Sequence, residues 1–313
     1  MRSVGGVTAS PPAPARRRLG RARAAVVVLA VAVLAVLAVR GCARAFDLDA
    51  AARERAAELV AEAAALPGVA GAGDVRTGIA DVGVAVRDAA VTVTLDAGSD
   101  AGAVRDLAAA LRPWSAGTAE PRAVRVHPVV EVDGFAAMLP APAADEGARL
   151  DLLDALRADP DLAGALVAPV QPGEEPLLDD GDARLVVRLT AADAARVPAV
   201  LERWRPRVAA AAADATVVVT GPADERQVLV DRSWRFDHGV AVPAWAEPVP
   251  GVAELVGRLA ADAAVTGYSV RADRAAPELA VTVADRAAVP GLLAALADLP
   301  AAAAFASVDV TAP

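Results

Sequence analysis

Hydrophobic and polar positions follow the same succession three times between residue 47 and the end of the sequence. Each copy begins with a helical period, passes a turn that ends in glycine, and continues with strand-like alternation. The alternating apolar positions are Val91, Val93 and Leu95, then Leu185, Val187 and Leu189, then Leu279, Val281 and Val283. This alternation predicts strands that pack one face on a core.

A second helix is predicted after each alternating strand. Its apolar residues are spaced i, i+3, i+4 and i+7, which places them on one stripe of a helix. The three stripes are Val104, Leu107, Ala108 and Leu111, then Val197, Val200, Leu201 and Trp204, then Val289, Leu292, Leu293 and Leu296. A closing strand follows each stripe, at 124–130, 216–220 and 307–311. Each copy therefore predicts the order αββαβ, with a right-handed strand–helix–strand crossover.

We predict an α+β fold from this repeat: an N-terminal transmembrane helix followed by three tandem αββαβ two-layer sandwiches. Gly71, Gly164 and Gly267 end the turn after the first helix of each copy, where glycine permits a tight reversal into a strand. The predicted sandwiches cover 47–130, 148–221 and 251–312, with an aromatic linker at 222–250. Domain boundaries are expected near Glu131–Gly147 and Pro222–Pro250, because these stretches contain Pro and Gly between copies.

The first 45 residues have a different composition from the repeats. Residues 1–23 contain six arginines and no acidic residue, and they are expected to form a disordered cytoplasmic tail. An unbroken apolar run from Ala24 to Val39 predicts a transmembrane signal anchor over residues 24–41. Positive charge before an apolar run predicts a single-pass protein of the cell membrane, with its N-terminus cytoplasmic and its repeats extracytoplasmic.

Two other fates of this segment stay open. Ala43-Arg44-Ala45 is an A-x-A site, after which a signal peptide would be cleaved. Val39-Arg40-Gly41-Cys42 is similar to a bacterial lipobox, in which Cys42 would be lipidated. The apolar run is longer than the core of a signal peptide, and this favours the retained anchor.

Charge and cysteine content exclude some functions. The chain has a formal net charge of −9, and all 40 acidic residues follow residue 45. Such an acidic region is a poor partner for nucleic acid. The single cysteine excludes an intrachain disulfide bond.

No catalytic, cofactor-binding or metal-binding motif is found in the sequence. The two histidines, His127 and His238, are far apart and are most simply structural. Asp179, Asp180 and Asp182 flank a glycine and could hold Ca²⁺, but their spacing does not match an EF-hand loop. We therefore predict no catalytic residue, no cofactor and no metal, and a protein that is not an enzyme.

The segment Pro222–Pro250 is the one candidate binding surface. It concentrates Trp234, Phe236 and Trp245 in a chain that is only 3% aromatic. Aromatic residues are enriched in binding hot spots, so these three residues are the candidates for contact with a partner. The alternative is that they fill the junction between the second and third copies.

The order αββαβ, the turn glycine and the V-x-V-x-L strand at Val91–Leu95 resemble the BON domains of bacterial envelopes. The resemblance implies a role in envelope maintenance or in lipid and partner binding, and it assigns no site residue. We predict a membrane-anchored, extracytoplasmic interaction or scaffold protein of a bacterial cell envelope, which contacts the membrane and an envelope protein. The alternatives are an extracytoplasmic carboxylate-dependent hydrolase and a BON-like lipid-binding protein.

Overall fold

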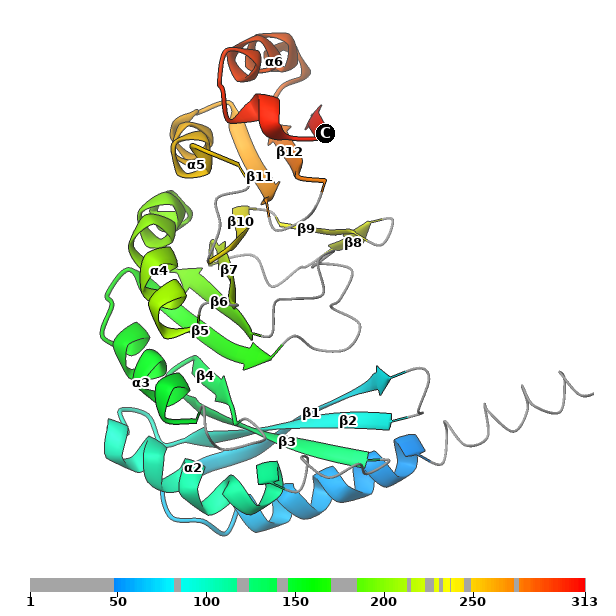
Figure 1. Ribbon diagram of the computed structural model, residues 1–313, viewed down its shortest axis with the longest axis vertical. Helices are drawn as coiled ribbons and strands as arrows, with labels where there is room; N and C mark the ends of the chain where they lie inside the picture. Colours follow the sequence, from blue (N-terminus) through cyan, green and yellow to red (C-terminus); the bar gives the residue numbers. More distant parts are fainter. Residues whose placement is uncertain are drawn as a thin grey trace, which may run out of the picture. The chain divides into compact units, whose positions relative to one another are not determined.

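Eleven strands form one mixed β-sheet in the computed structural model of the protein (Figure 1). The structure describes residues 48–81, 86–116, 124–139, 146–169, 185–212, 215–222, 228–230, 233–236, 238–244, 249–272 and 276–312. Across the sheet the strands are β1 (Val69–Asp81), β2 (Val86–Leu95), β3 (Val124–Val132), β4 (Phe135–Met138), β5 (Leu162–Pro169), β6 (Leu185–Ala191), β7 (Ala215–Thr220), β10 (His238–Pro243), β11 (Val265–Arg271), β12 (Glu278–Val283) and β13 (Ser307–Thr311). A separate two-stranded sheet pairs β8 (Val228–Val230) with β9 (Ser233–Arg235).

The helices cover one face of the large sheet (Figure 1). They are a helix over 48–63, α2 (Ala101–Ala116), α3 (Glu146–Arg157), α4 (Val197–Ala211), α5 (Val252–Ala261) and α6 (Val289–Ala297). The short 3-10 helices are η3 (Ala194–Arg196), η4 (Arg286–Ala288) and η5 (Ala302–Ala304). The alternating strand residues of the sequence pattern point to these helices and are buried, so a single core runs through the whole helix-covered face.

Three repeat units can be followed along the sheet. Unit 1 is the helix over 48–63 with β1, β2, α2 and β3; unit 2 is α3, β5, β6, α4 and β7; unit 3 is α5, β11, β12, α6 and β13. In each unit the first two strands are antiparallel, and the third is parallel to the second after a crossover helix. A parallel pair requires such a crossover, and this explains the second helix of every unit.

Two further strands join the units, and we call them bridging strands. β4 is antiparallel to β3 of unit 1 and parallel to β5 of unit 2. β10 is antiparallel to β7 of unit 2 and parallel to β11 of unit 3. Each bridging strand therefore lies between two units and pairs with both, so the sheet continues without a break.

The turn between β3 and β4 consists of two residues, and their backbone conformation defines its type. Asp133 and Gly134 both have positive φ, 53° and 82°, which is the geometry of a two-residue type I′ hairpin. The carbonyl of Gly134 also accepts the backbone N–H of Ala165 at 3.2 Å. A Cβ atom on Gly164 would lie 2.7 Å from this carbonyl oxygen, so the close approach of units 1 and 2 needs glycine there.

A β-bulge lies at the start of the first strand in every unit. The register shifts between Val69 and Gly71 in β1, between Leu162 and Gly164 in β5, and between Val265 and Gly267 in β11. The repeated turn glycine of the sequence thus marks a bulge at the same place three times. In each case the glycine directly follows the unpaired residue of the bulge, where the strand bends locally.

The predicted fold class is wrong in its central statement. The repeats are not three separate sandwiches, because their strands belong to a single eleven-stranded mixed sheet. Residues 50–313 accordingly form one compact body. The stretches expected to be boundaries, 131–147 and 222–250, contain the bridging strands that connect the units.

The predictions of a transmembrane helix and of a cell-membrane protein are likewise corrected. In the described part of the chain, no helix is long and apolar enough to cross a membrane. The segment 24–41 and the tail before it, on which these predictions depended, lie outside the described residues. Cys42 and the possible cleavage site after Ala45 lie outside them as well.

Asp159 links α3 and α4, the two helices of unit 2, through hydrogen bonds. It follows α3, and its carboxylate accepts the indole N–H of Trp204 on α4 at 2.6 Å and the guanidinium of Arg203 at 2.7 and 2.8 Å. Burial by itself raises the pKa of Asp159. The backbone N–H of Asp161, the indole and Arg203 outweigh burial and hold this pKa below its ordinary value.

We expect the stability of the protein to fall in acid partly through Asp159. A carboxyl with a lowered folded-state pKa stabilises the fold above its unfolded pKa, and this contribution is lost as pH falls through the folded value. Asp159→Asn should lower the free energy of unfolding by about 3 kcal/mol at neutral pH and flatten its decline below about pH 4. Denaturant titrations from pH 2 to 7 measure both effects. The exposed Asp106→Asn is the control and should behave as wild type.

We also expect the three units to unfold together, because their core and sheet are continuous. Val242 is buried in β10, and Val242→Ala should cost about 2 kcal/mol. Hydrogen exchange measured by mass spectrometry should then accelerate to a similar extent in β2 and in β12, at opposite ends of the sheet. Val75→Ala, at an exposed valine of β1, should leave exchange unchanged. Acceleration confined to strands next to β10 would contradict a single cooperative unit.

Candidate functional site

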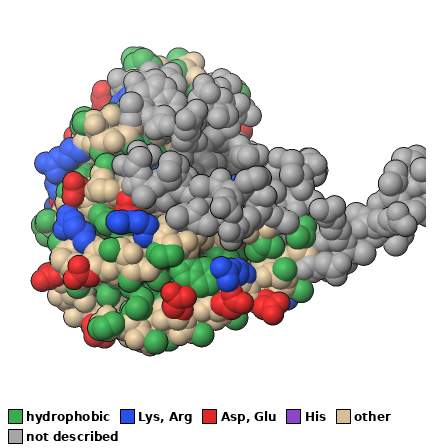
Figure 2. All heavy atoms as spheres, turned by 60° about the horizontal axis from the view of Figure 1, so that its bottom comes forward, with side chains coloured by type: hydrophobic (Ala, Val, Ile, Leu, Met, Phe, Trp, Pro, Cys, Tyr) green, Lys and Arg blue, Asp and Glu red, His purple; other side chains and the backbone are tan. Residues whose placement is uncertain are grey.

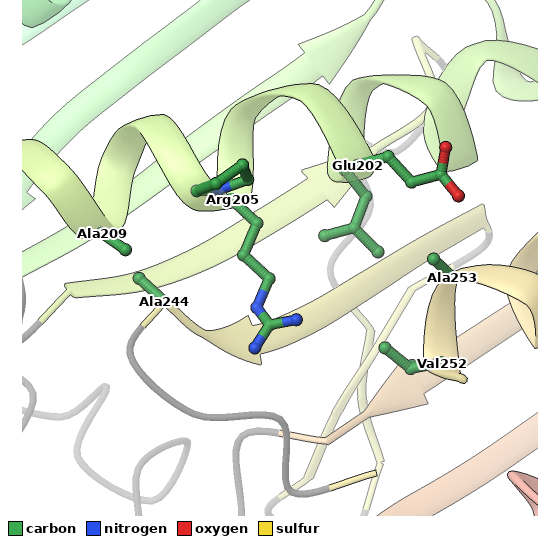
Figure 3. Close-up of a pocket in the computed structure, with 8 residues that line it drawn as sticks. Glu202, Arg205, Ala209, Ala244, Val252 and Ala253 are labelled. Atoms are coloured by element: carbon green, nitrogen blue, oxygen red, sulfur yellow. The ribbon is translucent and has the colours of Figure 1, made fainter. Parts of the chain in front are cut away.

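A groove lies between α4 of unit 2 and α5 of unit 3, above the end of β10 (Figure 3). Its volume is about 530 Å³. The lining residues are Leu201, Glu202, Arg205, Pro206, Ala209, Ala244, Val252 and Ala253. Six of these eight residues are apolar. A concave apolar site with few polar groups is typical of ligand and peptide binding sites.

The groove exists because small residues lie along the contact between α4 and α5. Leu201 belongs to the buried stripe of α4, and Val252 begins the buried stripe of α5. Ala209 and Ala253 extend only a methyl group toward the space between the helices. Pro206 lies inside α4 and has no N–H to donate to the carbonyl of Glu202, so one regular helical hydrogen bond is missing from this wall.

Arg205 and Glu202 are the charged residues of the groove. The Arg205 side chain extends from α4 toward the strand, between Ala244 and Val252, while the carboxylate of Glu202 points away from this guanidinium (Figure 3). Arg205 Nε donates to the carbonyl of Pro243, the last residue of β10, at 3.2 Å. This bond fixes the guanidinium at the floor of the groove.

A second cluster of charged groups lies on β2 and β3, on the sheet face opposite the helices. The carboxylate of Asp88 accepts Arg125 Nε at 2.8 Å and Arg125 Nη2 at 3.2 Å, and His127 Nε2 lies 3.4 Å from Asp88 Oδ1. Burial raises the pKa of Asp88, but the hydrogen bonds from His127 and Arg125 hold it below its ordinary value. Asp88 is thus ionised and paired, as expected of a structural ion pair.

The structure places Phe236, one of the three predicted partner-binding residues, outside the lining of the groove. Phe236 is only 8% exposed, and its N–H donates to Ser269 Oγ at 3.1 Å. Its ring lies 5.7 Å from the Arg271 guanidinium and against Gly239, where a Cβ would come within 2.6 Å of it. These contacts are on the sheet face opposite the helices. The side chain of Trp234 and all of Trp245 lie outside the described residues, so a role of this segment in binding stays a prediction.

The other sequence candidates contribute no site in the described residues. His127 belongs to the Asp88 cluster, and His238 stacks edge-on against Tyr268 with ring centroids 5.5 Å apart. The acidic cluster Asp179, Asp180 and Asp182 lies outside the described residues. Within the described ranges, no group of three or more His, Cys, Asp or Glu side chains is arranged to hold a metal ion.

The groove could not be located from the sequence pattern. Leu201 was visible only as a member of an apolar stripe, and a stripe predicts burial without saying what lies opposite. One local signal was present: Pro206 interrupts a helical pattern at the same repeat position as Pro113 in α2. A proline inside a helix marks a place where the backbone departs from regular bonding.

The chain matches no protein-family model, no curated protein and no solved structure. The likeness to BON domains thus stays a resemblance in the order of elements.

Proposed function

We propose that the protein is a non-catalytic interaction protein that binds an apolar segment of a partner protein in the groove between α4 and α5. The observation that carries this proposal is the groove itself, about 530 Å³ of largely apolar space at the junction of two units. This volume suits two or three apolar side chains of a partner.

The position of the groove supports a binding role for it. Its walls come from α4 and α5, its floor includes the end of β10, and these elements belong to the continuous core. A site on regular helices and strands is preformed, so binding costs little ordering of the protein. Ala244, which lines the groove, belongs to the segment 222–250 that was predicted to bind a partner.

Two buried carboxylates, Asp88 and Asp159, favour binding over the alternative of a carboxylate-dependent hydrolase. Glycoside hydrolysis requires one carboxyl that stays protonated through a raised pKa. Asp88 and Asp159 have lowered pKa values, because Asp88 accepts hydrogen bonds from His127 and Arg125, and Asp159 accepts them from the backbone N–H of Asp161, from Trp204 and from Arg203. Both serve the packing of the sheet and its helices in our proposal.

Surface charge is consistent with a protein partner. The described part of the face in Figure 2 carries acidic and basic side chains interspersed with hydrophobic ones. A nucleic-acid-binding face would instead gather arginines in one continuous patch. We therefore propose a protein partner and no nucleic acid.

A variant that fills the groove tests the proposal. Ala209→Trp places a large ring in the groove beside Ala244 (Figure 3), so we expect it to reduce recovery of partner proteins about tenfold or more. Tagged full-length protein is used to capture partners from an extract of its source organism. Recovery by the variant and by wild type is then compared by quantitative mass spectrometry.

Ala210→Trp is the matched control for this experiment. Ala210 is the next residue of α4 and is exposed, so its substitution leaves the groove open. We expect this control to retain the partners captured by wild type. Equal recovery by Ala209→Trp and Ala210→Trp, with both proteins folded by circular dichroism, would refute the proposed groove function.

A further inference from the structure

The second helices of the three units differ in what covers them. Ala108 of α2, Leu201 of α4 and Leu293 of α6 occupy the same position in the repeated stripe. Ala108 and Leu201 are 0% and 1% exposed, whereas Leu293 is 42% exposed. On α2 this side faces α3, because Arg105 pairs with Asp151 and Asp154 of that helix. On α4 it faces α5 across the groove.

The composition of α6 is unusual for a helix with a solvent-exposed face. Its nine residues, VPGLLAALA, include no polar side chain. Only Leu292 and Leu296 are buried, while Pro290, Leu293, Ala294 and Ala297 are exposed. A helix that is apolar on all sides is normally covered on all sides. Its exposed face therefore has the character of an interface.

The sheet is open at the same place. β13 is the last strand in the order and pairs on one side with β12. Its counterparts β3 and β7 each pair on their outer side with an antiparallel bridging strand. Val308 of β13 is 37% exposed. Unit 3 thus lacks, among the described residues, both the bridging strand and the next helix that units 1 and 2 receive.

The two edges of the sheet are not equivalent. Pairing of β1 with β2 is interrupted by three register shifts, and bulges of this kind protect an edge from further pairing. β13 runs in regular register with β12 through five residue pairs, from Glu278↔Ser307 to Thr282↔Thr311. The edge at β13 is the one that can accept another strand.

We propose that the outer edge of β13 and the exposed face of α6 (Pro290, Leu293, Ala294 and Ala297), together called the terminal surface, bind a strand–helix segment of a partner protein. The strand pairs antiparallel with β13, as β10 does with β7. The helix that follows packs an apolar, small-residue face on Leu293, as α5 does on Leu201. This surface is separate from the groove, and the inference does not depend on the proposed function.

The apolar composition of α6 determines which kind of helix can pack against it. α3 meets α2 through the carboxylates of Glu146, Asp151 and Asp154, which pair with Arg112 and Arg105. Against α6 these carboxylates would find no basic side chain on the helix. α5 instead contributes Val252 and Ala253 to its contact with α4, and its charged pair Glu254–Arg258 is exposed. The partner helix must therefore resemble α5 and not α3.

The chain supplies matched probes for the terminal surface. A fluorescently labelled peptide of residues 236–262 contains β10 and α5, and a peptide of residues 133–158 contains β4 and α3. We expect the first peptide to bind the full-length protein saturably in anisotropy titrations. The second should bind at least about tenfold more weakly, because its carboxylates lose solvation against α6.

Two substitutions on α6 locate the binding. Leu293→Asp and Ala297→Asp are at exposed positions, so both variants should keep the thermal midpoint of wild type. Each should weaken binding of the 236–262 peptide at least about tenfold. Ala210→Asp, on the exposed side of α4, is the control and should bind as wild type.

Three results would overturn the proposal. The 236–262 peptide could fail to bind the wild-type protein, or it could bind Leu293→Asp as tightly as wild type. Alternatively, sedimentation velocity could show that the protein alone self-associates in a manner abolished by Leu293→Asp. In that last case a second copy, and not a strand–helix segment of a partner, covers the terminal surface.

Discussion

The structure depends on one constraint, which is that the backbone groups of a strand inside a sheet must be paired on both sides. Each αββαβ unit alone would leave its first and third strands unpaired on one side. β4 and β10 satisfy these edges by pairing antiparallel with the unit before and parallel with the unit after. Because the helices follow the strands to which they are connected, the same pairing brings α2 against α3 and α4 against α5. The shared core, the ion pairs of Arg105 and Arg112, and the groove all follow from it.

The periodic parts of the sequence were enough to predict the elements of each unit but not their association. Two such patterns are the alternation at Val91, Val93 and Leu95 and the stripe at Val197, Val200, Leu201 and Trp204. Both depend on local geometry, and their residues are buried in the structure. The bridging strands carry no comparable pattern. β4 has four residues, and β10 is apolar on both faces because neighbours cover it on both sides. The Asp133-Gly134 pair was nevertheless a strong local hairpin signal, and it could have placed a strand where a linker was predicted.

The groove between α4 and α5 was less accessible to sequence analysis than the strands. Its shape depends on how far two helices of different units stand apart, and that distance is set by β10, which lies between their strands. Leu201 and Ala253 have ordinary helical positions, so no composition or spacing distinguishes them from core residues. Arg205 acquires its orientation from a backbone carbonyl of β10, 38 residues further along the chain. Such a contact is a property of the assembled sheet.

Identical positions in a repeat can therefore have different physical roles. Ala108, Leu201 and Leu293 are equivalent in the stripe, yet their surroundings are a salt-bridged helix pair, a groove and an exposed apolar face. The stripe is apolar in all three units because each second helix packs on its own sheet, and this requirement is local. What lies on the outer side of that helix is set by the following unit. The charged residues of α2 match the acidic residues of α3, while α6 has no polar residue at all. Variation between equivalent positions thus reflects what each helix contacts. In a chain built of repeats, this variation indicates which surfaces are functional.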